Sequence, residues 1–311
     1  MNIPDIPWVE KYRPDRFDDI IISDINKSIF SCIFTKDHFS NMLLYGPPGT
    51  GKTTTIINLV NKYFDNINVK NRKSSILHLN ASDDRGIDII RNQILQFVNT
   101  NSIYKKGLKF VILDEVDYMT KNAQSALKRV IQNVNDNVRF CLICNYISRI
   151  DNSLRNEFIC IRFNKLPENL VNSFLLNIIK KESLNIDEKQ VYNIQHKFGS
   201  DVRSMINYIQ LNSNKFEDSQ VLLDKSKFDD IYKYITSNIK TPLKIIEYFQ
   251  HISTVYNNDI TEIIKEYMNY LLNYHKEQYL NVETLNMLSN IIHHPDINIE
   301  HKLGYIVNNI L

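Results

Sequence analysis

The chain has 311 residues, of which 43% are apolar and 23% are charged, and its formal net charge is +2. These values fit a soluble globular protein with room for two or three cores, and they exclude attraction of polyanions through overall charge. No apolar run approaches the ~20 residues that span a bilayer, and the first residues lack the features of a signal peptide. We therefore expect no membrane partner and no secretion. The four cysteines show no disulfide pattern, which is typical of a reducing, intracellular compartment.

The N-terminal part contains an aromatic and basic segment, then a helical pattern. Residues 8–14 are too short and too polar for a core strand, and their composition fits a plain tether as well as an arm that packs over a ligand. Apolar residues recur with helical spacing over residues 20–34, which predicts an amphipathic helix. The apolar run Met42–Tyr45 then predicts the first strand.

A phosphate-binding motif follows this strand. The residues from Gly46 to Thr53 read G-P-P-G-T-G-K-T, a complete G-x-x-x-x-G-K-[ST] loop before a helical stretch that starts at Thr54. The glycines let backbone N–H groups approach a polyphosphate, and the next helix adds the positive end of its dipole. Lys52 is placed to contact the β- and γ-phosphates, and the Thr53 hydroxyl to hold Mg²⁺. The motif therefore predicts a nucleoside triphosphate site rather than a surface turn.

Two acids end a buried strand further along the chain. Residues 110–113 are apolar, and Asp114-Glu115-Val116-Asp117 follows them directly. Carboxylates at a strand end are costly unless they face a cation or water. We therefore expect Asp114 to hold Mg²⁺ through its water shell, and Glu115 to orient and activate the attacking water. An acidic strand end in solvent is the alternative, and the upstream phosphate loop argues against it.

The next predicted strand, Val138–Cys144, ends on the polar amide of Asn145. Cys141 and Cys144 lie three residues apart, so in a strand they point to opposite faces and do not share a metal. We interpret both as packing residues.

Strands alternate with helical patterns up to a last strand over residues 158–163, which predicts a parallel α/β sheet. Thr120 is expected to cap a helix over residues 121–131, before the strand Val138–Cys144. Residues 168–213 and 225–311 carry helical patterns, and the latter contain no further chemical motif.

Four segments resemble the small subunits of replication factor C, which are AAA+ ATPases. They are W-V-E-K-Y-R-P at 8–14, N-A-S-D-D-R-G-I at 80–87, D-E-V-D at 114–117 and G-S-D-V-R-S-M-I-N at 199–207. The resemblance rests almost wholly on residues 8–210. It implies a parallel-sheet AAA+ module over residues 1–164, a small helical lid over 165–224, and a helical collar over 225–311 that holds five subunits together.

The resemblance also implies the parts of an ATP site. In the family the first segment lies across the adenine, Asn145 stands at the sensor-1 position, and Arg203 stands at the sensor-2 position. The expected catalytic residues are Glu115, Lys52 and Asn145. The expected contacts of ATP and its Mg²⁺ are Val9, Tyr12, Arg13, Gly46, Pro47, Pro48, Gly49, Thr50, Gly51, Lys52, Thr53, Thr54, Asp114, Asn145 and Arg203.

The function implied is that of one subunit of an ATP-dependent clamp loader, with ATPase activity mainly in the assembled complex. The expected partners are the other subunits of a hetero-pentamer, a sliding clamp that the complex opens, and the primer–template DNA that receives the clamp during replication. The expected location is the nucleus of a eukaryotic cell or else a site of viral DNA replication.

Two alternatives are weighed against the clamp-loader function. Another AAA+ DNA motor, of the branch-migration type, fits the module but not the segments at 8–14 and 80–87. A nucleotide-binding assembly subunit with little ATPase of its own is disfavoured because the phosphate loop and the D-E-V-D acids are intact.

One position departs from the family pattern. Family members commonly have S-R-C before the last strand, and the arginine of this motif reaches into the neighbouring subunit's ATP site. Aligning Arg162-Phe163 with the family's final R-F puts Glu157 at the position of that arginine. Arg155 lies two residues away and replaces the arginine only if the local backbone is shifted.

Surface contacts are expected on two helices. The sliding clamp is expected to contact residues 99–102, while the apolar Ile94, Phe97 and Val98 just before them are expected mostly in the core. A solvated basic face explains each basic residue of these helices equally well. The candidates for DNA phosphate contacts are Arg85, Arg91, Lys121, Lys128 and Arg129.

Overall fold

The chain divides into two compact units, residues 1–213 and 214–311, and each is considered by itself. The boundary precedes the collar start predicted at residue 225, and the first unit contains the predicted sheet module and residues 165–213 of the predicted lid. The computed structural model describes residues 6–35, 39–66, 72–82, 93–100, 107–134, 136–213, 223, 225–237, 242–256, 258–279, 282, 285, 286 and 289.

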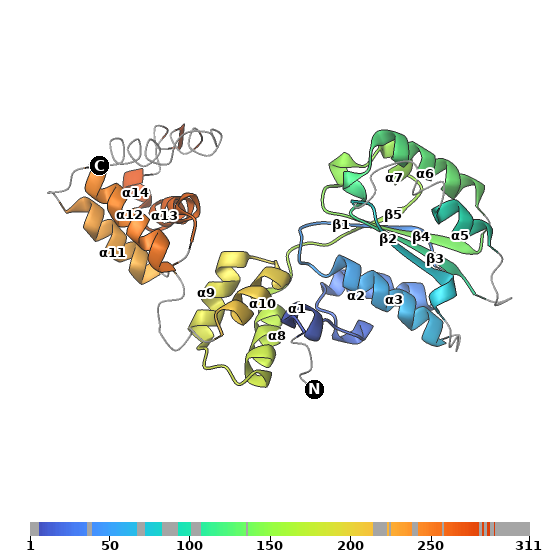
Figure 1. The fold of residues 1–311 in the computed structure, drawn as a ribbon, viewed down its shortest axis with the longest axis horizontal. Helices are drawn as coiled ribbons and strands as arrows, with labels where there is room; N and C mark the ends of the chain where they lie inside the picture. The colour runs from blue at the N-terminus through green and yellow to red at the C-terminus, as the bar shows by residue number, and fades with distance from the viewer. Residues whose placement is uncertain are drawn as a thin grey trace. The chain divides into compact units, whose positions relative to one another are not determined.

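A five-stranded sheet lies at the centre of the first unit, with the strand order β2-β3-β4-β1-β5 (Figure 1). All neighbouring strands are parallel, which confirms the prediction from the alternation of strands and helices. Parallel strands end at the same edge, so the residues that follow β1, β3 and β4 lie near one another there. The strands are β1 (Met42–Tyr45), β2 (Ile76–Asn80), β3 (Lys109–Asp114), β4 (Val138–Cys144) and β5 (Ile159–Arg162).

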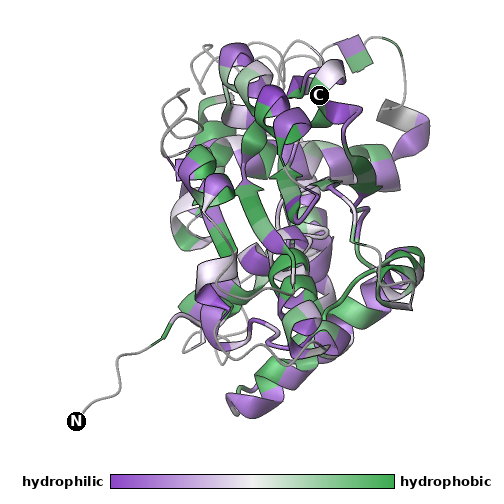
Figure 2. Ribbon diagram, turned by 90° about the vertical axis from the view of Figure 1, so that its right-hand side faces the viewer, coloured by the Kyte–Doolittle hydropathy of each residue, from purple (hydrophilic) through white to green (hydrophobic). Residues whose placement is uncertain are grey.

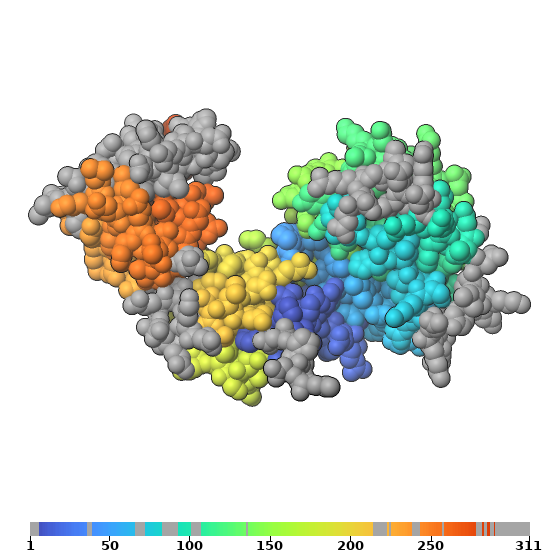
Figure 3. All heavy atoms as spheres, viewed as in Figure 1, coloured from blue at the N-terminus to red at the C-terminus, as the bar shows by residue number. Residues whose placement is uncertain are grey.

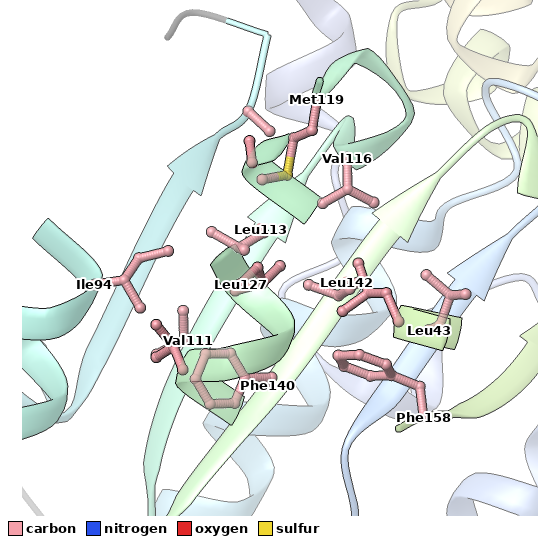
Figure 4. Packing of buried hydrophobic residues seen from close by; sticks show 14 of the residues in the cluster. Leu43, Ile94, Val111, Leu113, Val116, Met119, Leu127, Phe140, Leu142 and Phe158 are labelled. Carbon is pink, nitrogen blue, oxygen red and sulfur yellow. The ribbon is translucent and has the colours of Figure 1, made fainter. Parts of the chain in front are cut away.

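Helices cover both faces of this sheet. Leu43, Val111 and Leu142 face one hydrophobic core, shown in Figure 4, while Leu44 and Ile112 face the other. Burying each such side chain contributes about 1.5–3 kcal/mol, which is why the strands read as continuous apolar runs. Figure 2 shows the same strands coloured as hydrophobic. The covering helices are α5 (Leu95–Asn99), α6 (Lys121–Asn133) and α7 (Asn152–Arg155) on the first face, and α2 (Asp24–Thr35) and α3 (Lys52–Asn66) on the second.

The two cysteines of β4 lie on opposite faces of the sheet, as predicted. Cys144 belongs to the first core and Cys141 to the second. Burial raises the pKa of both thiols to about 12. Each is therefore a protonated packing residue rather than a nucleophile or metal ligand.

The predicted start of the first long helix is wrong. Helix α2 begins at Asp24 rather than Ile20, because Ile20 has an extended backbone, residues 21–23 are not helical, and Ile20 and Ile22 are buried in the second core. The Ser23 hydroxyl accepts the N–H of Asn26 at 3.4 Å, a cap that favours the later start. By contrast, the predicted cap of α6 is confirmed, because the Thr120 hydroxyl accepts the N–H of Ala123.

Three helices follow the sheet within the first unit. Asp187 begins the second of them with a reciprocal capping box that involves Gln190, and the Asp201 side chain caps the third by accepting the N–H of Ser204. These helices are α8 (Glu168–Lys181), α9 (Glu188–Phe198) and α10 (Val202–Leu211); the short elements of the unit are α1 (Trp8–Lys11), η1 (Phe17–Asp19), η2 (Lys73–Ser75), η4 (Val116–Tyr118) and η5 (Ile147–Arg149).

The described part of the second unit is helical. Its core is rich in aromatic rings, with Phe228 stacked on Tyr267 and Tyr270 at centroid distances of 6.3 and 5.7 Å. Among the described residues of the whole chain, no helix is long and apolar enough to cross a membrane. The helices are α11 (Lys225–Thr236), α12 (Pro242–Tyr256), α13 (Ile260–Tyr274) and α14 (Lys276–Tyr279).

Candidate functional site

The phosphate-binding loop connects β1 to α3 and needs two of its glycines for close backbone approaches. Gly46 has φ +145°, and a Cβ there would lie 2.1 Å from the carbonyl oxygen of Phe163. Gly49 has φ +69°, and a Cβ there would lie 1.9 Å from Asp201 Oδ1. A side chain at either position would collide with the chain that packs on the loop, so the loop conformation depends on glycine.

Lys52 lies under this loop with only 6% of its surface exposed. Its ammonium group donates to the carbonyl oxygens of Gly46 at 2.9 Å and Pro47 at 2.7 Å, and to Asn145 Oδ1 at 3.0 Å. Burial lowers the pKa of Lys52, and the negative charge of Asp114 opposes this shift. The lysine is thus held on the amide that follows β4, with each of its three donors paired.

The acids that follow β3 meet the threonine of the loop. The Thr53 hydroxyl donates to Asp114 Oδ2 at 2.6 Å, and the Glu115 N–H donates to Asp114 Oδ1 at 2.9 Å. Glu115 has φ +55°, a left-handed conformation that is uncommon for a residue with a side chain. The turn that follows is stabilised by the Tyr118 N–H, which donates to the Glu115 carbonyl oxygen at 3.0 Å.

The loop after β3 is bonded to the loop after β4. Asp117, which is 5% exposed, accepts the N–H of Tyr146 on Oδ2 at 3.2 Å. Tyr146 directly follows Asn145, so this bond holds the Asn145 loop beside the loop that carries Glu115. The two polar strand ends predicted from the sequence therefore lie together.

One cavity collects most of the predicted site residues. Gly46 and Pro47 do not line it, but their carbonyl oxygens accept hydrogen bonds from Lys52. The predicted residues that line the cavity are Val9, Tyr12, Arg13, Pro48, Gly49, Thr50, Gly51, Lys52, Thr53, Thr54, Asp114, Glu115, Asn145 and Arg203.

Sequence reasoning missed the apolar lining of this cavity. Ile20 and Ile21 come from the chain before α2, whereas Leu166, Phe174 and Ile206 come from the chain after the sheet. No motif marks them, since an apolar residue at helical spacing is equally typical of a core. The same cavity therefore has a polar end at the sheet edge and an apolar part that includes these side chains.

The residues present fit a magnesium–nucleotide complex. A hydroxyl at Thr53 and a carboxylate at Asp114 are the oxygen ligands that Mg²⁺ prefers, directly or through water. No cluster of three or more His, Cys, Asp or Glu suited to a metal occurs within the described ranges. So few protein ligands suit a metal that substrate phosphates hold for the most part, as is usual for Mg²⁺. Lys52 and Arg203 supply positive charge at the cavity, and the charge of Arg203 further lowers the pKa of Lys52.

Comparisons with known proteins identify the family. A sequence model of the ATPase family associated with various cellular activities (AAA) matches residues 42–165. Human replication factor C subunit 5 is 39% identical over 265 residues, which cover 84% of this chain and 75% of that protein. The chain belongs to the replication factor C family. Replication factor C subunit 3 of Schizosaccharomyces pombe is 39% identical over 205 residues, 66% of this chain and 59% of that protein.

A solved structure supports the fold of this replication factor C family member. The RuvB Holliday junction branch migration motor of Thermotoga maritima matches with a TM-score of 0.52 and 14% sequence identity. The matched region covers 84% of this chain and 91% of the RuvB chain. At this identity the likeness concerns the AAA+ fold alone. The parallel sheet with helices on both faces is thus the AAA+ architecture expected from the sequence.

The position aligned with the family's S-R-C arginine does not present a free cation. Glu157 accepts a hydrogen bond from Gln132 Nε2 of α6 at 2.7 Å. Arg155 is exposed at the C-terminal end of α7. The substitution of Glu157 for the arginine of the S-R-C motif stays a prediction from the sequence alignment, with the exposed Arg155 two residues away as its alternative.

The candidate partner contacts are only partly described. Lys121 and Arg129 are exposed on α6 and Lys128 is half-buried, whereas Arg85 and Arg91 lie outside the described residues. The buried environment of Ile94 and Val98 confirms their predicted place in the core, with Phe97 partly buried beside them. Of the predicted clamp contact, residues 99 and 100 are described and residues 101 and 102 are not.

Proposed function

We propose that this chain binds ATP and Mg²⁺ in the described cavity and hydrolyses ATP as one subunit of a clamp loader. The observation that carries the proposal is that the intact phosphate loop, both strand-end acids and Asn145 meet at one cavity in a member of the replication factor C family. Fold alone would not support this function, because AAA+ modules drive many machines.

In this proposal Lys52 contacts the β- and γ-phosphates, and loop N–H groups bind their oxygens. Mg²⁺ would neutralise charge that develops on the phosphates, with Thr53 and Asp114 holding it. Glu115 orients the attacking water and takes up its proton, while Asn145 contacts the γ-phosphate or that water. These roles use the bonds seen in the cavity, because Lys52 and Asn145 are already joined and the Asp114 carboxylate already accepts from Thr53.

The assembly is also part of the proposal. Residues 1–164 would be the AAA+ module, 165–224 the lid, and 225–311 a collar that binds other subunits of a hetero-pentamer. The complex would open a sliding clamp and place it on primer–template DNA, in the nucleus for a eukaryotic cell. An arginine from a partner would complete this chain's ATP site, whereas Glu157 would face the next subunit's site and leave that site slow.

Purification of the native complex tests this proposal. We expect a tagged chain to retain other AAA+ subunits, and to retain a ring-shaped clamp when ATP is present. We also expect the ATPase rate of this complex to rise when clamp and primer–template DNA are added together. A complex that hydrolyses ATP without binding a clamp would contradict the clamp-loader role while leaving the ATPase intact. The likeness to the branch-migration motor, at 14% identity, does not favour that second function.

A further inference from the structure

The N-terminal arm, defined as residues 8–14, is fastened to the helices that follow the sheet. Lys11 Nζ lies 2.5 Å from Glu182 Oε1, and the Tyr12 hydroxyl donates to the same oxygen. The Trp8 N–H donates to Gln210 Oε1 at 2.9 Å, across 202 residues of sequence. Helix α1 packs against α10, and Figure 3 shows the dark-blue arm lying against the yellow helices.

The other end of the arm is bonded to the helix that follows the phosphate loop. Arg13 Nε donates to Thr54 Oγ1 at 3.3 Å, and Asn58 Nδ2 donates to the carbonyl oxygen of Pro14 at 2.8 Å. Both partners lie on α3. The arm therefore bridges two walls of the cavity, one made by α3 and one made by the lid helices.

Glu182 is the point where the arm's side chains converge. Its side chain is 17% exposed and directly follows α8, whose residue Lys181 places its ammonium 5.7 Å from the Tyr12 ring centre. The hydrogen bonds from Lys11 and Tyr12 lower the pKa of Glu182. A carboxylate that accepts from a cation and a phenol in a half-buried place forms charge-assisted bonds, which are about twice as strong as neutral ones.

The arm and the lid also share the cavity. Val9, Tyr12 and Arg13 of the arm line it together with Arg203 and Ile206 of α10. We propose that Glu182 is a positioning residue that joins the arm to the lid, so that nucleotide binding and lid placement change together. This inference rests on the proposed function, because it takes the ligand of the cavity to be ATP.

Trp8 provides a direct readout, because it is the single tryptophan of the sequence. Its ring lies edge-on to Tyr12 at a centroid distance of 6.4 Å, so its emission reports how the arm is docked. The full chain, in its wild-type form and as Glu182→Gln, is titrated with ATP and MgCl₂ while Trp8 emission is recorded. The matched control is Glu188→Gln, which removes the same charge from an exposed position in the first turn of α9.

We expect Glu182→Gln to shift Trp8 emission before ATP is added and to raise the Kd for ATP by roughly three- to tenfold, since fewer molecules then hold the arm in the binding position. Glu188→Gln should match the wild type in both measurements. The ATPase rate of the reconstituted complex at saturating ATP should be unchanged in Glu182→Gln, because added ligand restores the docked arm.

A second variant approaches the contact from the other side. Tyr12→Phe removes the hydroxyl that donates to Glu182 and keeps the ring. If Glu182 acts through the arm, the effects of Tyr12→Phe and Glu182→Gln on Kd will be less than additive in the double variant. Additive effects, or equal Kd and equal emission in Glu182→Gln and wild type, would overturn the inference alone. A wild-type chain that binds no ATP would overturn the proposed function as well.

Discussion

The two sides of the nucleotide cavity are built in different ways. On the sheet side, Asp114 is the last residue of β3, Asn145 directly follows β4, and Lys52 begins the helix of the phosphate loop. Backbone pairing fixes their separation, and their hydrogen bonds run between neighbouring elements. On the other side, called the lid side because α8–α10 lie in the predicted lid, the arm meets Glu182 and Gln210 through hydrogen bonds between residues 170 to 202 apart in sequence.

This difference predicts how each side responds to substitution. The sheet-side groups are placed by a continuous hydrogen-bonded ladder, so a conservative change there removes chemistry without moving the neighbours. The lid-side groups are placed by the packing of α1 on α10 and by a few partly exposed polar bonds, which solvent screens. Changes on the sheet side should therefore abolish the chemical step or greatly weaken phosphate binding, whereas changes on the lid side should shift the ATP affinity by a smaller factor.

The largest effect is expected for Glu115→Gln. The amide keeps the size of the side chain but cannot take up a proton, so the ATPase kcat of the assembled complex should fall by about 10²–10⁴-fold. ATP affinity, measured by titration, should stay within about twofold. A Glu115→Gln complex that turns over ATP at the wild-type rate would remove this residue from the chemical step.

Lys52→Ala should follow, with ATP affinity lowered by about 10²-fold. The change removes a charge that sits on the phosphates and leaves the Asn145 amide without its cation. Isothermal titration with ATP measures the affinity, and Lys62→Ala is the matched control. Lys62 lies on the same helix, where it is paired with Asp18. Equal ATP affinity in Lys52→Ala and wild type would show that the loop lysine does not bind phosphate.

Glu157→Arg tests a residue that is proposed to act on the neighbouring subunit's ATP site rather than on this chain's own cavity. A supplied arginine is worth ~10³-fold or more in evolved sites, and an introduced one should recover part of this. We expect the ATPase of the assembled complex to rise about tenfold while that of the isolated chain is unchanged, because the finger acts on the neighbour. If Arg155→Ala instead abolishes the neighbour's hydrolysis, the alignment is wrong and Arg155 is the finger.

The smallest effect is expected from pH, on the lid side. Because the folded-state pKa of Glu182 lies below its unfolded value, its bonds contribute fully above about pH 4.5 and are lost as pH falls through the lower folded value. The hydrogen bond to Glu182 raises the pKa of Lys11, and burial raises the pKa of Tyr12. Both groups therefore stay protonated and keep donating to Glu182 until strongly alkaline pH.

Trp8 emission should therefore be flat from about pH 6 to 9 and change at acid pH before the helical signal in circular dichroism is lost. Glu182→Gln should lack this acid step, because its amide does not titrate. An acid step of the same size in the variant would assign the transition to general unfolding.

Sequence patterns predicted the sheet more closely than the segments around it. Val138–Cys144 was predicted with the bounds that the structure has, because a strand buried on both faces reads as an unbroken apolar run. The helix predicted from Ile20 begins at Asp24, because apolar residues at helical spacing do not distinguish the first turn from an extended segment that packs on the same core.

The sequence by itself determined the phosphate loop, the two strand-end acids and the amide of Asn145. Each of these features lies at the end of a strand, where its chemistry can be recognised from the local sequence. Parallel pairing of the strands then brings the features to the same edge of the sheet. On the lid side the resemblance named Val9, Tyr12, Arg13 and Arg203, but only the tertiary structure decided the contributions of Glu182 and Phe174 and the contacts that dock the arm. The physical reason is that contacts between distant segments depend on how whole helices pack, which no local spacing encodes.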